Sequence, residues 1–243
     1  MYIFGNLTFK KSKSMKKILL FFTLCTLILS INAQNIQTHY DFGKGRKYVT
    51  TTVEMFKPDK LGNTFFFIDF DYGIPGQDFM SNAYFEIARV MTIKKSPFGI
   101  HAEYNGGFGK INNSDHFFSV NNAWLGGIDY SKNAKDFSKG FSLKLMYKEI
   151  QKKQSSFQIT GVWYVNFLKG KMSFTGFADF WKEDSDFNFD GTTDATFTFL
   201  SEPQLWYNIN GHFSVGSEVE LSNNFAGMEG FNVMPTLGAK WTF

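Results

Sequence analysis

Apolar and polar residues alternate along the final stretch of the chain, residues 231–243. The odd positions are apolar: Phe231, Val233, Pro235, Leu237, Ala239, Trp241 and Phe243. Apart from Met234, the even positions are small or polar. A period of two places the two sets on opposite faces of a β-strand. A soluble sandwich strand can show the same alternation, so this stretch alone predicts only a half-apolar strand.

Similar alternation recurs along the chain and predicts twelve strands in a single domain. We expect them at residues 36–42, 47–57, 63–73, 81–93, 98–108, 117–130, 140–150, 156–168, 172–181, 196–208, 212–222 and 231–243. The last strand ends on an aromatic residue, which suits the aromatic girdle of an outer-membrane barrel. The pattern predicts an all-β fold, namely an antiparallel transmembrane β-barrel of about twelve strands.

The lengths of the connections test this interpretation, because alternate connections of such a barrel are short periplasmic turns. The expected turns are residues 58–62, 94–97, 131–139, 169–170 and 209–211, and all but 131–139 are tight. The opposite set includes the longer connections 74–80, 110–116, 182–195 and 223–229, although 44–46 is also short. The asymmetry favours a barrel with both ends of the sheet on the periplasmic side.

Three residues fit the strand pattern less well. Pro203 and Pro235 each remove a ladder donor within an expected strand, which a closed barrel tolerates at bulges or rims. Arg89 falls on the apolar face of its strand. We expect either a bulge near Ala88 or a guanidinium group that reaches the membrane rim.

Residues 1–33 have the pattern of a secretory signal peptide, so the barrel is expected to comprise residues 34–243. A basic region at 15–17 precedes an apolar run at 18–31 and a cleavage site before Gln34. That run is short for a transmembrane helix. Residues 1–14 precede a second methionine and are interpreted as an upstream extension. Cys25, the sole cysteine, lies in the apolar run, so the barrel has no thiol chemistry.

Charge and composition agree with a barrel in lipid. Five of the 25 basic residues and none of the 22 acidic ones lie in residues 1–33, so residues 34–243 carry a net charge of 20 − 22 = −2. Nothing suggests a nucleic-acid partner. Aromatic residues make up 19% of the chain, yet the mean hydropathy is −0.21. The alternative is a secreted β-sandwich, which has to bury one face of nearly every strand.

The inward-facing positions of the predicted barrel combine acidic, aromatic and basic side chains. This interior set comprises Glu54, Phe65, Phe67, Asp69, Asp71, Glu86, His101, Glu103, Asp129, Lys144, Lys148, Asp179, Trp181, Glu202, Trp206, Glu218 and Glu220. Rings stack on flat apolar faces and carboxylates accept hydrogen bonds, so sugars and nucleobases suit such a wall. The excess of carboxylates disfavours anions. The alternative for each residue is an acid–lysine network that only fills a narrow interior.

Two other kinds of site are weaker candidates. From Asp186 the sequence partly matches a calcium loop, with Asp186, Asn188 and Asp190 as ligands, but Phe197 stands where the bidentate glutamate is required. A solvated acidic turn is therefore the favoured interpretation. A hydrolase needs a histidine beside a serine, and Ser214 shares a strand face with His212. Alternation produces such pairs freely, so we expect no catalytic residue, resident metal or cofactor.

Three stretches carry a family resemblance: residues 48–73 (YVTTTVEMFKPDKLGNTFFFIDFDYG), 83–90 (AYFEIARV) and 121–130 (NNAWLGGIDY). They resemble the Tsx-like superfamily of nucleoside-specific outer-membrane channels, and especially a branch whose members begin like residues 39–43 (HYDFG). The resemblance implies a narrow, monomeric, twelve-stranded barrel that passes nucleosides by facilitated diffusion. None of that family's nucleoside-contacting residues is matched here by motif, so none is carried over.

The sequence therefore predicts a passive channel of the bacterial outer membrane for small neutral or cationic solutes, with nucleosides favoured by the resemblance alone. Its expected partners are outer-membrane lipid and the solute, and its expected state is a monomer. One alternative is a barrel without an open pore that serves a structural or surface-interaction role. A less favoured alternative is an outer-membrane hydrolase that depends on His101 or His212.

Overall fold

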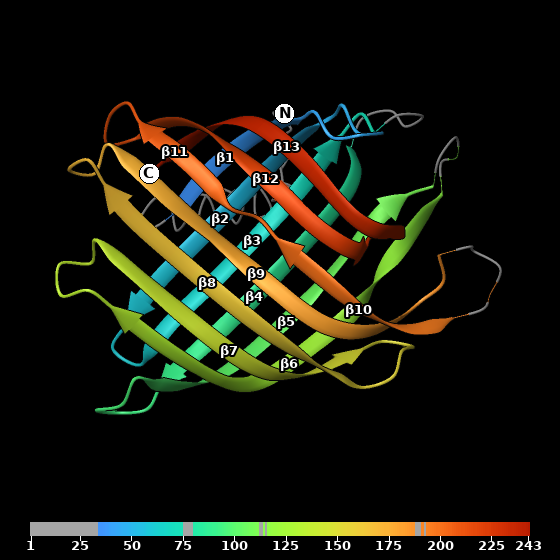
Figure 1. The fold of residues 1–243 in the computed structure, drawn as a ribbon, viewed down its shortest axis with the longest axis horizontal. Helices are drawn as coiled ribbons and strands as arrows, with labels where there is room; N and C mark the ends of the chain where they lie inside the picture. The colour runs from blue at the N-terminus through green and yellow to red at the C-terminus, as the bar shows by residue number, and fades with distance from the viewer. Residues whose placement is uncertain (1–33, 75–79, 112–113, 115, 188–190, 192) are drawn as a thin grey trace, which may run out of the picture. The chain divides into compact units, whose positions relative to one another are not determined.

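The computed structural model describes residues 34–74, 80–111, 114, 116–187, 191 and 193–243, which form a barrel of antiparallel strands (Figure 1). The strands are β1 (Gln34–Asp41), β2 (Val49–Asp59), β3 (Gly62–Tyr72), β4 (Met80–Thr92), β5 (Phe98–Lys110), β6 (Phe117–Asn133), β7 (Lys139–Ile150), β8 (Ser156–Phe167), β9 (Met172–Ser185), β10 (Asp194–Ser201), β11 (Gln204–Asn208), β12 (Phe213–Phe225) and β13 (Met228–Thr242). The described residues contain no helix long and apolar enough to cross a membrane. The predicted signal peptide lies outside these residues.

The sheet closes on itself because β1 pairs with both β2 and β13. Strands β10 and β11 together occupy one strand position, or stave, of the barrel, since both pair with β9 on one side and with β12 on the other. They are separated at Glu202-Pro203, where the proline has no N–H to donate. The predicted closed barrel of twelve staves is therefore confirmed, with one stave broken in two.

The two ends of the barrel differ in their connections. At the end where β1 starts and β13 stops, the connections are residues 60–61, 93–97, 134–138, 168–171 and 209–212. At the other end they are residues 42–48, 73–79, 111–116, 151–155, 186–193 and 226–227. Outer-membrane barrels have short periplasmic turns and longer extracellular loops, so we assign the first end to the periplasm.

The long connection expected at residues 223–229 is wrong. Strand β12 continues to Phe225 and β13 already begins at Met228. Only Ala226 and Gly227 make the turn, and their φ angles are 51° and 78°. Positive φ at both central residues is the geometry of a two-residue hairpin turn that matches the twist of its strands. The polar sequence before Phe225 resembles a loop, but backbone pairing extends through it.

Arg89 lies at the membrane rim. Strands β3 and β4 pair regularly from Gly62 opposite Met91 to Asp71 opposite Asn82, so no bulge occurs near Ala88. The Arg89 guanidinium instead contacts the Asp59 carboxylate at the periplasmic end of β2, with an Nη1–Oδ2 distance of 2.6 Å. This contact explains how a charged residue is tolerated on an otherwise apolar face.

The two prolines lie within the wall, at gaps in the backbone ladder. Val219 N donates to Pro203 O (3.0 Å), and Val219 lies directly opposite Pro235 on β13. Next to that pair, side chains replace ladder bonds: Ser217 Oγ donates to Thr236 O (2.6 Å) and Glu218 N donates to Thr236 Oγ1 (3.1 Å). Side-chain hydroxyls therefore satisfy backbone groups beside the interrupted ladder.

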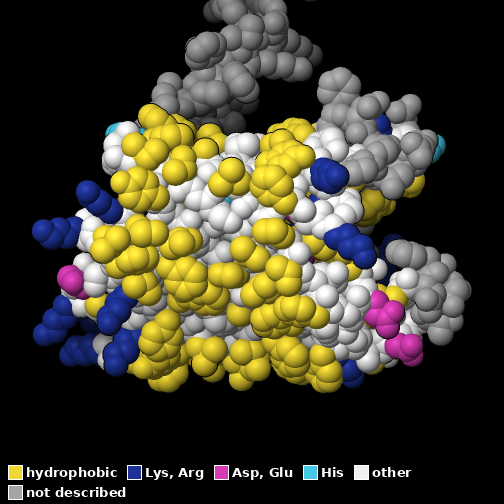
Figure 2. Space-filling model, turned by 45° about the horizontal axis from the view of Figure 1, so that its top comes forward, with side chains coloured by type: hydrophobic (Ala, Val, Ile, Leu, Met, Phe, Trp, Pro, Cys, Tyr) yellow, Lys and Arg dark blue, Asp and Glu magenta, His cyan; other side chains and the backbone are white. Residues whose placement is uncertain are grey.

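The barrel is apolar outside and polar inside. Its exposed residues include Ile100, Trp124, Ile128, Leu143, Leu145, Tyr147 and Leu237, whereas its buried residues include Gln37, His39, Asp41, His101, Asp129 and Ser222. Apolar side chains cover much of the face seen in Figure 2. A water-soluble sandwich has the reverse distribution. An apolar outer band with a polar interior is the arrangement of a barrel embedded in lipid.

Candidate functional site

The pairing register defines which side chains face the interior, because directly opposed residues share a face of the sheet. Asp69 lies opposite Thr52 and Tyr84, and Thr52 lies opposite the buried Gln37. On the outer face of the same sheet, Ile87, which follows Glu86 on β4, is exposed. Followed around the barrel, this register places the members of the interior set other than Glu202 on the inner face. Glu202 follows by alternation from Leu200, which lies opposite the buried Ser222.

Carboxylates from many staves form an acidic wall within this interior. The wall consists of Glu54, Asp69, Asp71, Glu86, Asp179, Glu202 and Glu218, all of them partly exposed. The charge of Glu202 acts on those of Glu218, Asp69 and Glu86, although these residues come from separate strands. Glu86 is in turn close enough to Asp179 for their charges to interact. Like charges from several sides of the barrel therefore converge on the interior.

Neutral donors hold six of these seven carboxylates, all except Glu202. Thr52 Oγ1 donates to Asp69, Thr50 Oγ1 and Asn82 Nδ2 donate to Asp71, Asn35 Nδ2 donates to Glu54, Tyr84 OH donates to Glu86, Thr160 Oγ1 donates to Asp179 and Gln204 Nε2 donates to Glu218. Among the described residues, no carboxylate of the wall forms an ion pair. Lys148 is nevertheless close enough to Glu86 and Asp179 for their charges to interact, so the acid–lysine network that the sequence left open stays a prediction.

Two of the interior lysines, Lys148 and Lys240, lie against rings. Lys148 Nζ donates to Gln158 Oε1 (2.6 Å) and lies 4.1 Å from the Trp181 ring centroid. Lys240 Nζ lies 4.2 Å from the Trp206 ring centroid. A ring face stabilises a cation without neutralising a carboxylate. These contacts hold both ammonium groups, and among the described residues neither lysine forms a direct ion pair with the acidic wall.

Arg46 forms the one buried interior cluster of ion pairs within the described part of the chain. Its guanidinium contacts Asp41 (3.0 Å) on β1 and Glu220 (2.8 Å) on β12. Arg46 belongs to the extracellular connection 42–48, so these pairs fix that connection to the mouth of the barrel. Both carboxylates are buried, and buried carboxylates require such partners.

Part of the interior is tightly packed. The side chains of Trp206, Met146 and His101 are at most 1% exposed. Trp206 Nε1 donates to Gln204 Oε1 (2.9 Å), and His101 Nε2 lies 2.9 Å from Glu103 Oε2. These side chains fill the part of the interior in which they lie.

Several interior residues are missing from the sequence-based set: Gln37, His39, Asp41, Arg46, Tyr84 and Lys240. Alternation on the first and last strands could have found His39 and Lys240, because their neighbours at Tyr40 and Trp241 are apolar. Arg46 has no such signal. It precedes β2, and only the closure of β1 against β13 brings β12 within its reach.

The weaker candidates receive little support from the described residues. His212 Nδ1 lies 2.8 Å from Thr242 O, whereas Ser214 Oγ donates to Asn208 Oδ1 (2.7 Å), so the two side chains take different partners. In the suggested calcium loop, Asp186 Oδ2 accepts a hydrogen bond from Gly191 N (2.8 Å). Asn188 and Asp190 lie outside the described residues, so that loop stays a sequence-based prediction.

A closed antiparallel barrel with an apolar exterior and a charged interior defines a β-barrel protein of the bacterial outer membrane. The chain belongs to the family described as "Domain of unknown function (DUF5020)", whose sequence model matches residues 33–243.

Solved structures with a similar fold are outer-membrane proteins. NanC porin matches with a TM-score of 0.56 and 8% identity, covering 87% of this chain and 100% of that one. KdgM porin matches with a TM-score of 0.48 and 11% identity over 87% and 99%. The Acinetobacter baumannii outer membrane protein Omp33 matches with a TM-score of 0.43 and 12% identity over 87% and 98%. No curated protein sequence matches the chain. At these identities the likeness to NanC porin supports the fold alone.

Proposed function

We propose that this barrel is a passive outer-membrane channel for small neutral or cationic polar solutes. The observation that carries the proposal is the acidic wall, whose carboxylates face the interior and, except for Glu202, are held by neutral donors. Rings of Asp and Glu side chains favour cations in channels and disfavour anions. Carboxylates used only as filler would be matched by basic partners, as they are at Arg46.

Nucleosides are the solutes that we favour within this class, on the strength of the Tsx-like resemblance. The interior offers groups of the right chemistry. The rings of Phe65 and Phe67 lie 6.0 Å apart between centroids, and Phe67 lies 6.0 Å from Tyr84. Glu86 is directly opposite Phe67. An aromatic row beside a carboxylate can stack on a base and accept a hydrogen bond from a sugar hydroxyl.

The test is a permeability measurement on purified, folded barrel in liposomes and in planar bilayers. We expect liposomes to swell with uridine, which is neutral. We expect them to swell much less with uridine monophosphate, because it is an anion and the acidic wall repels it. In a potassium chloride gradient, we expect the reversal potential to indicate preference for potassium. Liposomes that swell no faster than empty vesicles would contradict the channel.

A matched pair of variants assigns the selectivity. The double variant Glu86→Gln, Glu202→Gln removes two charges from the acidic wall, so we expect the preference for potassium over chloride to fall severalfold. Glu149→Gln removes one charge from the outward-facing side of β7 and serves as the control, with selectivity expected to stay unchanged. Equal selectivity in all three proteins would show that the acidic wall does not line the conducting path.

A barrel without an open pore is the second candidate. Several inward-facing side chains, including Trp206, Met146 and His101, are almost completely buried, as expected of an interior filled by its own side chains. This candidate predicts a folded, membrane-inserted barrel that conducts no ions and passes no uridine. Swelling and conductance together therefore distinguish the two candidates.

A further inference from the structure

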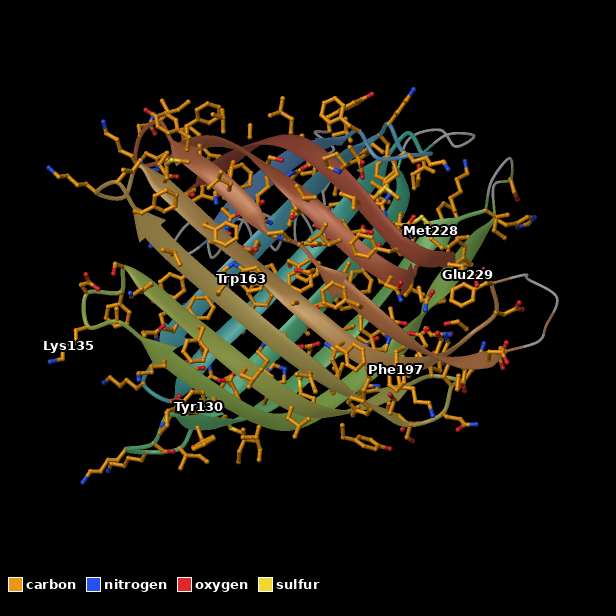
Figure 3. The ribbon with its side chains drawn as sticks, in the orientation of Figure 1. Tyr130, Lys135, Trp163, Phe197, Met228 and Glu229 are labelled. Atoms are coloured by element: carbon orange, nitrogen blue, oxygen red, sulfur yellow. The ribbon has the colours of Figure 1, made fainter. Side chains whose placement is uncertain are left out.

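Nine of the described lysines lie at the periplasmic end of the barrel, along four successive turns. These periplasmic lysines are Lys57, Lys60, Lys94, Lys95, Lys132, Lys135, Lys139, Lys169 and Lys171, and all are exposed. They lie in or beside the turns β2–β3, β4–β5, β6–β7 and β8–β9, which follow one another around the sheet. Figure 2 shows Lys and Arg side chains gathered at this end, and Figure 3 labels Lys135 there.

Acidic residues offset little of this charge. Of the acidic residues in these four turns, Asp59 is already paired with Arg89 and Asp136 accepts hydrogen bonds from Ser138. The described residues at the opposite end carry both signs: Lys44, Lys47, Lys152 and Lys182 are exposed there, and so are the acidic residues Asp194 and Glu229. The exposed charge is therefore mixed at the opposite end and mostly basic at the periplasmic end.

The position of the lysines indicates a lipid surface. Lys57, Lys132 and Lys139 continue the outward-facing side of their strands, so their side chains point away from the interior. Large apolar residues lie beside them in the turns and are strongly exposed: Leu61 (71%), Phe137 (68%) and Leu168 (63%). Apolar side chains next to lysines are the combination that anchors a protein at the headgroup level.

We propose that the periplasmic lysines bind the anionic headgroups of phospholipids in the periplasmic leaflet. Each of the four turns supplies ammonium groups, and three of them also supply one of these exposed apolar residues. A phosphodiester anion such as phosphatidylglycerol complements this surface, whereas zwitterionic phosphatidylcholine offers no net charge. The fifth periplasmic turn, residues 209–212, has no lysine, so the binding surface covers one side of the barrel. This inference does not depend on whether the barrel conducts.

The test is lipid retention by the folded full barrel. Barrel in detergent is mixed with equal amounts of phosphatidylglycerol and phosphatidylcholine, and retained lipid is measured by native mass spectrometry. A lysine near an anionic surface changes binding by about fivefold. We expect the variant Lys60→Gln, Lys95→Gln, Lys135→Gln, Lys169→Gln, with one change in each turn, to lose at least about fivefold of the phosphatidylglycerol preference. High salt should weaken the preference of the unaltered barrel.

The control variant carries Lys44→Gln, Lys47→Gln, Lys152→Gln and Lys182→Gln at the opposite end, and we expect it to retain phosphatidylglycerol like the unaltered barrel. Equal loss in both variants would overturn the proposal, because it would reflect total charge alone. Unchanged retention in the periplasmic variant would also overturn it. If that variant instead loses binding to polyglutamate in solution, the surface serves an acidic soluble partner. Both variants are expected to keep the shifted gel mobility of a folded, unheated barrel, which excludes misfolding as the cause.

Discussion

The two arginines of the barrel show how position alone sets the importance of a residue. Arg46 reaches into the interior, where its side chain is 17% exposed and contacts two carboxylates that are nearly inaccessible. Arg89 contacts one exposed carboxylate at the rim. A buried ion pair that loses one partner leaves an uncompensated charge, whereas an exposed pair is replaced by water. The same residue type therefore has a structural role in one place and little effect in the other.

We expect Arg46→Met to destabilise the barrel by about 3 kcal/mol, because Asp41 and Glu220 would stay buried without a cation. Arg89→Met is the matched control and should shift the unfolding transition far less. Urea titration of both variants in phospholipid vesicles, followed by tryptophan fluorescence, measures the difference. Equal transitions would mean that water already solvates the Arg46 cluster.

At the scale of strands, bulges and breaks decide which residues face inward. Unbroken alternation from Asp129 back along β6 assigns Ser119 to the interior. The register shift between Asn105 and Gly107 of β5 instead places Ser119 opposite Phe108, whose side chain is exposed on the outer face. One extra residue in one strand reverses the faces beyond it. The break between β10 and β11 at Pro203 is a related case. There a glycine of the neighbouring strand β9 leaves room for the broken segment.

Gly176 of β9 makes room for that break. A Cβ atom at Gly176 would lie 2.8 Å from Glu202 O, 2.8 Å from the Trp163 ring and 2.9 Å from Pro203 Cα. We therefore expect Gly176→Ala to destabilise the barrel by roughly 1–3 kcal/mol through overpacking. Gly161→Ala on the adjacent β8 is the control, since nothing would lie within 4 Å of a Cβ atom added there. A Gly176→Ala variant as stable as the control would show that the Glu202-Pro203 segment moves easily.

At the scale of the whole molecule, the barrel has the reverse of a soluble protein's polarity. The apolar residues that alternate along each strand end on the outer face, where they need lipid rather than a second sheet to cover them. Leu145, near the middle of β7, is 61% exposed, while its neighbour Lys144 faces the interior. Adjacent residues of one strand therefore face lipid on one side and the polar interior on the other.

This arrangement predicts opposite tolerance at adjacent positions. Leu145→Arg places a charge in the hydrocarbon layer and is expected to cost about 2–4 kcal/mol, whereas Lys144→Arg keeps a cation in the interior and should change stability little. The measurement is the urea midpoint of each variant refolded into vesicles. If Leu145→Arg were as stable as Lys144→Arg, the outer face would be in contact with water, and the assignment to the membrane would fail.

The sequence by itself determined the all-β barrel, the number of staves and the inward or outward side of the interior set. A strand between lipid and a polar interior needs period-two alternation along its whole length, so each local stretch of sequence contains the pattern. Tertiary structure decided what closure brings together. The Arg46 cluster joins residues 174 positions apart, and the acidic wall assembles from many strands. Pro203 and Pro235 both lie next to Val219 on β12. Such contacts depend on stagger and on one-residue shifts in register, and local alternation does not record either.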